Sequence, residues 1–308
     1  MSGSLVLFDA PDVTYVLRRS IGLRVLSVCT ERNHPALVNF RVSLERLGYE
    51  YEILGLGERW GGWKWRTKKY LNALEQLRPE ALVLLSDCTD VLFVEPPEEL
   101  ERRFKALKVP IAIGGERGLS TGKYRYDLPE RRRVRDRYRE RKPMSSYRFP
   151  NAGLIIGYVA PLLRLLYMNR DAEDDQAGLV ELYDMQPNIF YIDTDMRLFG
   201  NLVQRAPFFD DDLEVYERAK WRVEWTLDIP HQSNTIRECR RYARLVNNET
   251  NGAPCILHFA GGNWESYNEV GPMLLGPIHQ PVYTTGNEHV RLIVKKSWTG
   301  ALSWLVSK

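Results

Sequence analysis

The sequence lacks the features that mark a membrane protein, a disulfide scaffold or a general polyanion binder. No apolar run is long enough to cross a bilayer, and the first residues show no basic segment followed by a sustained apolar stretch. Its four cysteines form no CxxC pair. The net charge of only +3 argues against a protein that binds nucleic acid over its whole surface. We therefore expect a protein of a reducing compartment, the cytoplasm.

What is present is the composition of a globular chain, with 308 residues, 44% of them hydrophobic and 27% charged. From residue 23 onward, short apolar runs alternate with segments of helical periodicity. The first helical segment, 35–47, is followed by Gly48, which favours a helix end. The alternation predicts an α/β fold with a mainly parallel sheet, whose ligands bind beyond the carboxyl ends of the strands. The segments are the strands RVLSVCT, YEYEILGLG, ALVLLSD and VPIAIGG, and the helices 35–47, 63–77 and 96–108.

Residues 117–148 interrupt this pattern with an arginine-rich stretch. A solvated helix or a loop is one interpretation, and a lid over an anionic ligand or an acceptor is another. A nucleic-acid-binding arm built on the basic run 131–142 is a third, although no known module is visible there. Further on, strands are predicted in NAGLIIGYV, NIFYID and PCILHFAGG, and in VRLIVKK of the tail.

Two carboxylates lie where the buried strand ALVLLSD ends, Asp87 and then Asp90. Burial of carboxylates without a partner is costly, and a divalent cation that bridges them to a diphosphate would remove that cost. The alternative is one aspartate that caps a turn and one that is solvated. His258 ends another apolar strand and is followed by two glycines, which let a backbone approach a phosphate. Carboxylates suit Mg²⁺ or Mn²⁺, and the imidazole favours Mn²⁺.

The segment DAEDDQ has four acidic residues in five positions and precedes a predicted helix. Such carboxylates can simply interact with the helix dipole. They can also face a sugar, bind its hydroxyls and stabilise positive charge at the reacting carbon. The sequence leaves both interpretations open.

Seven motifs follow one another in order over roughly residues 23–268: LSVCT, LGLGERW, SDCTDVLF with Lys64 upstream, RFPNAGLIIGYV, DAEDDQ, DTDMRLFGNL and ILHFAGG. In this order they resemble the glycosyltransferase domain of the multifunctional procollagen lysyl hydroxylases. The resemblance implies a GT-A-like fold with a Rossmann-like nucleotide-binding half. It also implies a Mn²⁺-dependent transfer of glucose or galactose from a UDP-sugar to a hydroxyl acceptor, such as a collagen-like hydroxylysine glycan. None of the five histidines begins an HxD motif, so the oxygenase activity of that family is not expected.

The resemblance also implies a role for individual residues. The chain departs from the family in three places. The family has an aromatic residue where Thr89 stands, a lysine where Trp264 stands, and a tryptophan-bearing segment after the glutamate matched by Glu116, where this chain has its arginine-rich insert. The implied roles are metal ligands for Asp87, Asp90 and His258, uridine contact for Thr30, diphosphate contact for Lys64 and the Gly261 loop, a sugar pocket lined by Asn151, and transfer for Asp174 and Asp175.

We divide the chain into an N-terminal extension, 1–22, a GT-A domain, 23–268, with its basic insert at about 117–148, and a C-terminal extension, 269–308, packed on the domain. Two other functions stay open at this point. One is a catalytically silent module that binds a sugar nucleotide or a glycan, and the other is a nucleic-acid-associated protein. The sequence predicts no membrane span and leaves the oligomeric state undetermined.

Overall fold

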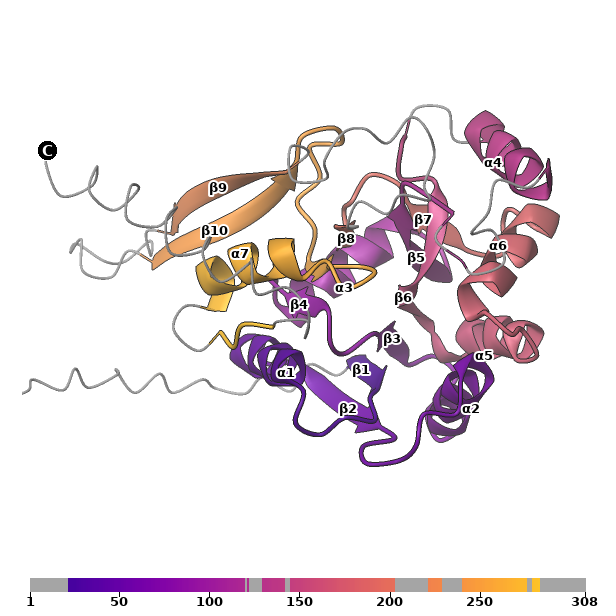
Figure 1. Ribbon diagram of the computed structural model, residues 1–308, viewed down its shortest axis with the longest axis horizontal. Coiled ribbons are helices and arrows are strands. Elements are labelled where there is room, and N and C mark those ends of the chain that lie inside the picture. The colour runs from indigo at the N-terminus through magenta and orange to yellow at the C-terminus, as the bar shows by residue number, and fades with distance from the viewer. Residues whose placement is uncertain are drawn as a thin grey trace, which may run out of the picture.

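The structure is a computed structural model that describes residues 22–119, 121, 129–141, 145–202, 221–228, 240–275 and 279–282. The elements form one sheet with helices on both faces, with a smaller sheet and a two-stranded ladder beside it (Figure 1). In this part of the chain, no helix combines the length and the apolar character needed to cross a membrane.

The main sheet has six strands in the order β2-β1-β3-β6-β5-β7. The pairs β1–β2, β1–β3 and β5–β7 are parallel, whereas β6 runs antiparallel to both β3 and β5. The predicted mixed, mainly parallel sheet is therefore confirmed, with β6 as its one reversed strand. The bounds are β1 (Leu23–Val28), β2 (Glu50–Leu54), β3 (Leu82–Ser86), β5 (Ile111–Glu116), β6 (Phe149–Tyr158) and β7 (Tyr191–Asp193).

A second sheet of three strands has the order β4-β11-β8. Its central strand pairs antiparallel with β4 and parallel with β8. The antiparallel ladder of β9 and β10 lies beside it. The bounds are β4 (Val91–Phe93), β8 (Phe199–Asn201), β9 (Trp221–Asp228), β10 (Arg240–Asn247) and β11 (Ile256–His258).

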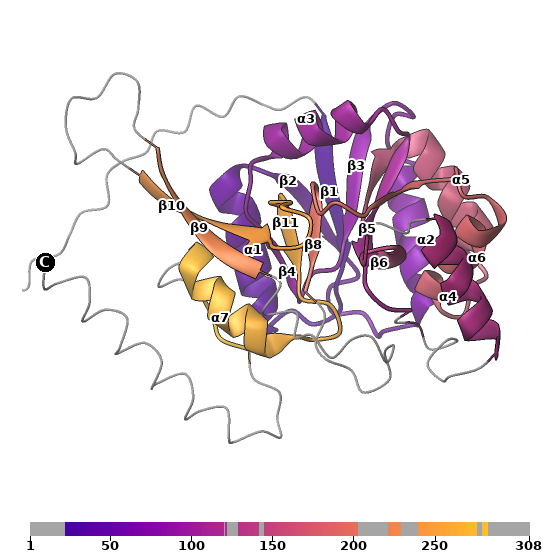
Figure 2. The same cartoon turned by 90° about the horizontal axis from the view of Figure 1, so that it is seen from above.

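Side chains of the main sheet alternate between two hydrophobic cores, as expected for a strand period of two. In β3, Val83 and Leu85 pack in the core with α2, α4, α5 and α6, whereas Leu82 and Leu84 pack in the core with α1 and α3. Figure 2 shows α2, α4, α5 and α6 gathered on one side of the sheet. The bounds are α1 (Pro35–Leu47), α2 (Trp63–Leu74), α3 (Pro97–Leu107), α4 (Pro129–Arg141), α5 (Val159–Asn169), α6 (Asp175–Met185) and α7 (Trp264–Leu275).

The ends of the helices follow local chemistry. Helix α1 has proline in its first turn, and it ends at Gly48, whose φ of 78° is left-handed, as its position after the periodic segment predicts. Helix α2 ends at Leu74, short of the predicted residue 77. There Gln76 N and Leu77 N bond to carbonyls three residues back, so the chain tightens into turns before Pro79.

The arginine-rich insert contains a helix, α4, which packs on α6. Tyr138 is buried and donates its hydroxyl hydrogen to Val180 O. Arg137 and Arg141 both pair with Asp184 of α6. One face of this helix is therefore part of the fold. The predicted tail strand VRLIVKK lies outside the described residues, and α7 runs across the boundary that we expected at residue 268.

Candidate active site

Asp87 and Asp90 lie on the four-residue connection between β3 of the main sheet and β4 of the small sheet. The backbone fixes both ends of this turn. Asp87 N donates to Gly153 O of β6 at 2.8 Å, and Phe259 N, just after β11, donates to Asp90 O at 2.7 Å. The turn thus joins the two sheets at the edge where the sequence places the ligand site.

His258 ends β11 with a side chain that is only 3% exposed. Its Nδ1 lies 2.8 Å from Oδ1 of Asn201, the last residue of β8, and Asn201 Nδ2 donates to Gly115 O at 2.8 Å. An amide oxygen accepts, so this arrangement assigns the ring hydrogen to Nδ1. Nε2 then faces the two carboxylates, 3.6 Å from Asp87 Oδ2 and 3.4 Å from Asp90 Oδ2.

These three residues fit a divalent cation. One ligand atom from each of Asp87, Asp90 and His258 lies within 4.8 Å of the others. A Cβ atom at position 153 would lie 2.3 Å from His258 Cε1 and 2.8 Å from Asp87 Oδ2, so glycine is what leaves room for this cluster. Two carboxylates with one oriented imidazole form a donor set suited to Mn²⁺, with Mg²⁺ as the harder alternative.

The electrostatics of His258 reflect the same convergence of acceptors. Burial lowers the pKa of the imidazole, but the carboxylates of Asp90 and Asp87 outweigh burial and raise the pKa above its usual value. The position therefore favours a positive charge, whether a proton or a cation carries it.

Arg66 of α2 lies beside this cluster and was not predicted from the sequence as a site residue. Its Nη1 donates to Asp87 Oδ1 at 2.6 Å, and its Nε donates to Asp175 Oδ2 at 3.0 Å. The side chain is 8% exposed. The only signal in the sequence was a basic residue in the first turn of the helix that follows Gly61 and Gly62, which is too common a pattern to be specific.

The acidic cluster has members in different environments. Asp174 is the N-cap of α6, and its side chain accepts a hydrogen bond from Ala177 N at 2.9 Å. Asp175 is buried and pairs with Arg66. Glu173 is exposed and accepts a hydrogen bond from Lys64 Nζ at 2.5 Å. Lys64 and Arg66 therefore tie the first turn of α2 to the start of α6.

Asn151 belongs to a buried polar network at the start of β6. Its Nδ2 donates to Glu116 Oε2 at 2.9 Å, and its Oδ1 accepts from Gly153 N at 2.9 Å. Gln176, next to Asp175, donates to Glu116 Oε1 at 2.7 Å and accepts from Ala152 N at 3.0 Å. The network connects the acidic helix to the backbone beside the candidate metal ligands.

The other predicted contacts lie on backbone that borders the same edge. Thr30 follows β1, and its carbonyl accepts from Gly57 N at 2.9 Å, which fastens the glycine-rich loop to this strand end. Gly261 has a φ of 70°, and a Cβ atom there would meet no atom within 4 Å. The loop after His258 is thus open at this position.

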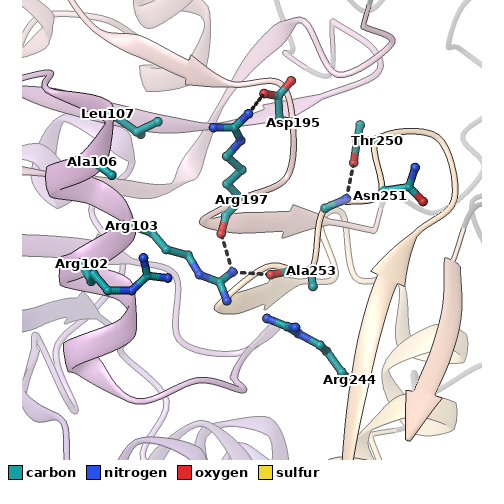
Figure 3. A pocket seen from close by; sticks show the side chains of 11 residues that line it. Arg102, Arg103, Ala106, Leu107, Asp195, Arg197, Arg244, Thr250, Asn251 and Ala253 are labelled. Carbon is teal, nitrogen blue, oxygen red and sulfur yellow. Dashed lines mark hydrogen bonds and ion pairs between the residues drawn. The ribbon is translucent and has the colours of Figure 1, made fainter. Parts of the chain in front are cut away.

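A separate pocket lies at the other end of the three-stranded sheet. Its volume is about 680 Å³, and arginines from α3, from the segment before β8 and from β10 line it together with the loop 250–253 (Figure 3). Arg103 donates to the carbonyls of Arg197 and Ala253 in its wall. Because β8 and β11 begin here and end at Asn201 and His258, the pocket and the candidate metal ligands occupy opposite ends of these strands.

A mixed sheet flanked by helices, with acidic residues after β3 and a histidine at the end of β11 in the adjoining small sheet, is the arrangement expected of a glycosyltransferase of the GT-A-like class. The family model of the PLOD GT domain matches residues 19–273, and the chain belongs to this family.

The curated relatives are longer proteins. The chain is 28% identical over 219 residues to procollagen-lysine,2-oxoglutarate 5-dioxygenase 1 of Gallus gallus, which covers 65% of this chain and 28% of the relative. The Homo sapiens protein of the same name is 28% identical over 198 residues, with 58% of this chain and 25% of the relative covered. The chain thus matches about a quarter of the length of these relatives. Among solved structures it is similar to a glycosyltransferase involved in the glycosylation of the major capsid of PBCV-1, with a TM-score of 0.44, 10% identity, and 82% of this chain and 99% of that chain covered.

Proposed function

We propose that this chain is a Mn²⁺-dependent hexosyltransferase that uses a UDP-sugar. In the reaction, the bond between the sugar C1 and the phosphate oxygen breaks, a bond from C1 to an acceptor oxygen forms, and the acceptor hydroxyl loses its proton. The observation that carries the proposal is the convergence of Asp87, Asp90 and the anchored Nε2 of His258 within 4.8 Å.

The residues of the site would divide the work as follows. Asp87, Asp90 and His258 would hold the cation, which would supply charge neutralisation for the departing diphosphate. Lys64 and the open backbone at Gly261 would bind diphosphate oxygens. Thr30, at the end of β1, would contact the uridine, because nucleotides lie beyond the carboxyl ends of such strands.

The sugar would lie between the start of β6 and the start of α6. Asn151, held by Glu116, would line the sugar pocket. Asp174 and Asp175 would orient the sugar or the acceptor hydroxyl and stabilise positive charge at C1. We assign no nucleophile.

The resemblance to the procollagen lysyl hydroxylases supports glucose or galactose as the transferred hexose. It supports a collagen-like hydroxylysine glycan as the acceptor. The arginine-rich insert 117–148 replaces a tryptophan-bearing segment of the family, so the acceptor of this chain would differ where that segment contacts it.

The test is a screen of UDP-, GDP- and CMP-sugars for cation-dependent release of the nucleotide, with the transferred sugar followed by mass spectrometry. We expect release from UDP-glucose or UDP-galactose with Mn²⁺ and its loss in excess EDTA. Asp87→Asn serves as the matched negative control. Binding of a UDP-sugar with no release under any condition would instead identify a silent binding module.

A further inference from the structure

Arg66 is a buried cation between two carboxylates that belong to different elements. Nη1 donates to Asp87 Oδ1 at 2.6 Å, Nε donates to Asp175 Oδ2 at 3.0 Å, and Nη2 also donates to Asp175 Oδ2. Asp87 follows β3, whereas Asp175 opens α6. Helices α2 and α6 also contact each other directly. One guanidinium therefore connects the candidate metal turn to the acidic helix.

The arrangement of the two carboxylates suits an arginine side chain and not a lysine. The planar guanidinium presents several donors in fixed directions, so it can bind two carboxylates at once, whereas the lysine ammonium is a single point charge. Burial lowers the pKa of Arg66, but Asp175 and Asp87 outweigh burial and raise it, so the group keeps its charge. The ring of Trp63 covers the guanidinium, with Arg66 Cζ 4.8 Å from the ring centroid.

The two oxygens of Asp87 have different partners. Oδ1 accepts the hydrogen bond from Arg66, and Oδ2 faces His258 Nε2 at 3.6 Å. Arg66 thus fixes the rotation of the carboxyl group and leaves Oδ2 directed toward His258 and Asp90. A residue that orients a ligand in this way contributes to affinity without contact to the cation.

We propose that Arg66 is a positioning residue that holds Asp87 for coordination through Oδ2 and couples the cation site to Asp175 at the start of α6. The inference rests on the proposed function insofar as it takes Asp87 to be a cation ligand. It predicts that changes at Asp175 reach the cation through Arg66, although Asp175 is not among the ligands.

Loss of Arg66 would have two opposing effects on a cation. Removal of the positive charge would strengthen binding, because Arg66 repels a divalent ion, while loss of orientation would weaken it. Arg66→Lys keeps the positive charge but removes the planar guanidinium that binds both carboxylates, so it isolates the effect of orientation. Asp175→Asn keeps Arg66 and removes one of its two anchors.

The experiment is a titration of Mn²⁺ alone, followed by the electron paramagnetic resonance signal of the free ion. It uses the full chain as wild type, Arg66→Lys, Asp175→Asn and the double variant. Lys69→Met is the matched control, since Lys69 lies one turn further along α2 and pairs with the exposed Glu58. Thermal unfolding of each variant, measured in parallel, reports whether the fold is intact.

We expect Arg66→Lys to weaken Mn²⁺ binding roughly 10-fold or more, as for loss of a group that orients a ligand. Asp175→Asn should weaken binding less, and the double variant should match Arg66→Lys, because both changes act through one guanidinium. Folded Arg66→Lys protein with wild-type affinity would overturn the inference, and so would additive effects. Wild-type protein that binds no Mn²⁺ would overturn the cation site and the proposed function as well.

Discussion

The two ends of the three-stranded sheet carry side chains of opposite charge, and these side chains have different kinds of partner. At one end, the metal end, His258 Nε2 lies 3.6 Å from Asp87 Oδ2 and 3.4 Å from Asp90 Oδ2. At the other end, arginines gather around the pocket of Figure 3.

At the arginine end, each arginine has a carboxylate nearby. Glu99 accepts hydrogen bonds from both Arg102 and Arg103. Arg197 Nη2 lies 3.0 Å from Asp195 Oδ2, and Arg244 Nη2 lies 3.5 Å from Glu95 Oε1. At the metal end, Arg66 engages one oxygen of Asp87, while Asp87 Oδ2 and Asp90 Oδ2 both lie near a buried imidazole. Two carboxylates thus converge on one buried imidazole, and the raised pKa of His258 shows that this point favours a positive charge, whether a proton or a cation carries it. The arginines at the other end already have carboxylate partners of their own. The comparison favours the metal end as the ligand site, because its acceptor atoms converge on one point, whereas the arginines around the pocket are held by separate partners.

The largest effects are expected from substitutions at the metal end. Asp87→Asn or Asp90→Asn removes a charged oxygen ligand, and turnover should fall roughly 10²–10³-fold, as when a preorganised electrostatic contact is lost. Transfer rates at saturating UDP-sugar and Mn²⁺ measure the loss. Unchanged turnover in both variants would remove the basis for the contrast between the two ends.

Asp174 permits a clean separation of chemistry from helix capping. Asparagine caps a helix about as well as aspartate, so Asp174→Asn should leave the thermal midpoint close to wild type. If the carboxylate faces the transferred sugar, kcat should still fall roughly 10²-fold, with UDP affinity unchanged. Asp174→Ala, which also loses the hydrogen bond to Ala177 N, should cost about 1 kcal/mol of unfolding free energy in addition. Wild-type kcat in Asp174→Asn would leave only the capping role.

Asn201 tests whether orientation of His258 matters. Asn201→Ala removes the acceptor for Nδ1, and Mn²⁺ affinity should fall roughly 10–100-fold, as for other groups that orient a histidine ligand. Asn263→Ala is the control, since Asn263 is also buried but donates to Leu202 O instead. Equal affinity of the two variants would contradict the orienting role.

Local signals in the sequence predicted much of the fold. The apolar runs gave β1, β3 and β5, and the residues around helix ends gave α1 and the start of α3, because these depend on neighbours in the chain. Pairing direction depends on distant segments. The antiparallel course of β6, and the separate sheet that β4 forms with β11 and β8, had no local signature.

The residues of the candidate site also differ in whether a local signal in the sequence predicts them. Asp87 and Asp90 were predicted as ligands from their place at the end of a buried strand, and the family resemblance implied His258 as the third; the structure brings the three together. Arg66 and Asn201 were missed, since each acts through a side chain from a remote segment. The roles of Thr30 and Lys64 stay predictions.

The pH dependence of cation binding should distinguish the metal end by its sign. His258 has a raised pKa without a cation, so its protonated form stabilises the cation-free fold at low pH, and this contribution is lost as pH rises through that pKa. A cation requires the neutral imidazole, so Mn²⁺ affinity should rise with pH, by up to about tenfold per unit below the pKa. Calorimetric titrations across pH 5.5–8 would show this slope, and a flat profile would mean that His258 is not a ligand.

The smallest effects are expected at the arginine end, where the comparison can be broken most directly. Arg197 and Asp195 have side chains that are 62% and 45% exposed, and such exposed pairs contribute roughly 0–1 kcal/mol. Arg197→Ala should therefore change the thermal midpoint little, and transfer rate and Mn²⁺ affinity should stay within about twofold of wild type, because surface substitutions away from special features have small effects. Arg102→Ala, on α3 and 68% exposed, provides a second variant from another wall of the same pocket. If either change lowered transfer strongly while Mn²⁺ affinity stayed constant, the arginine end would belong to the acceptor site. An acidic acceptor would then displace the carboxylates that pair with these arginines. The pairing of the arginines could no longer distinguish this pocket from the catalytic edge.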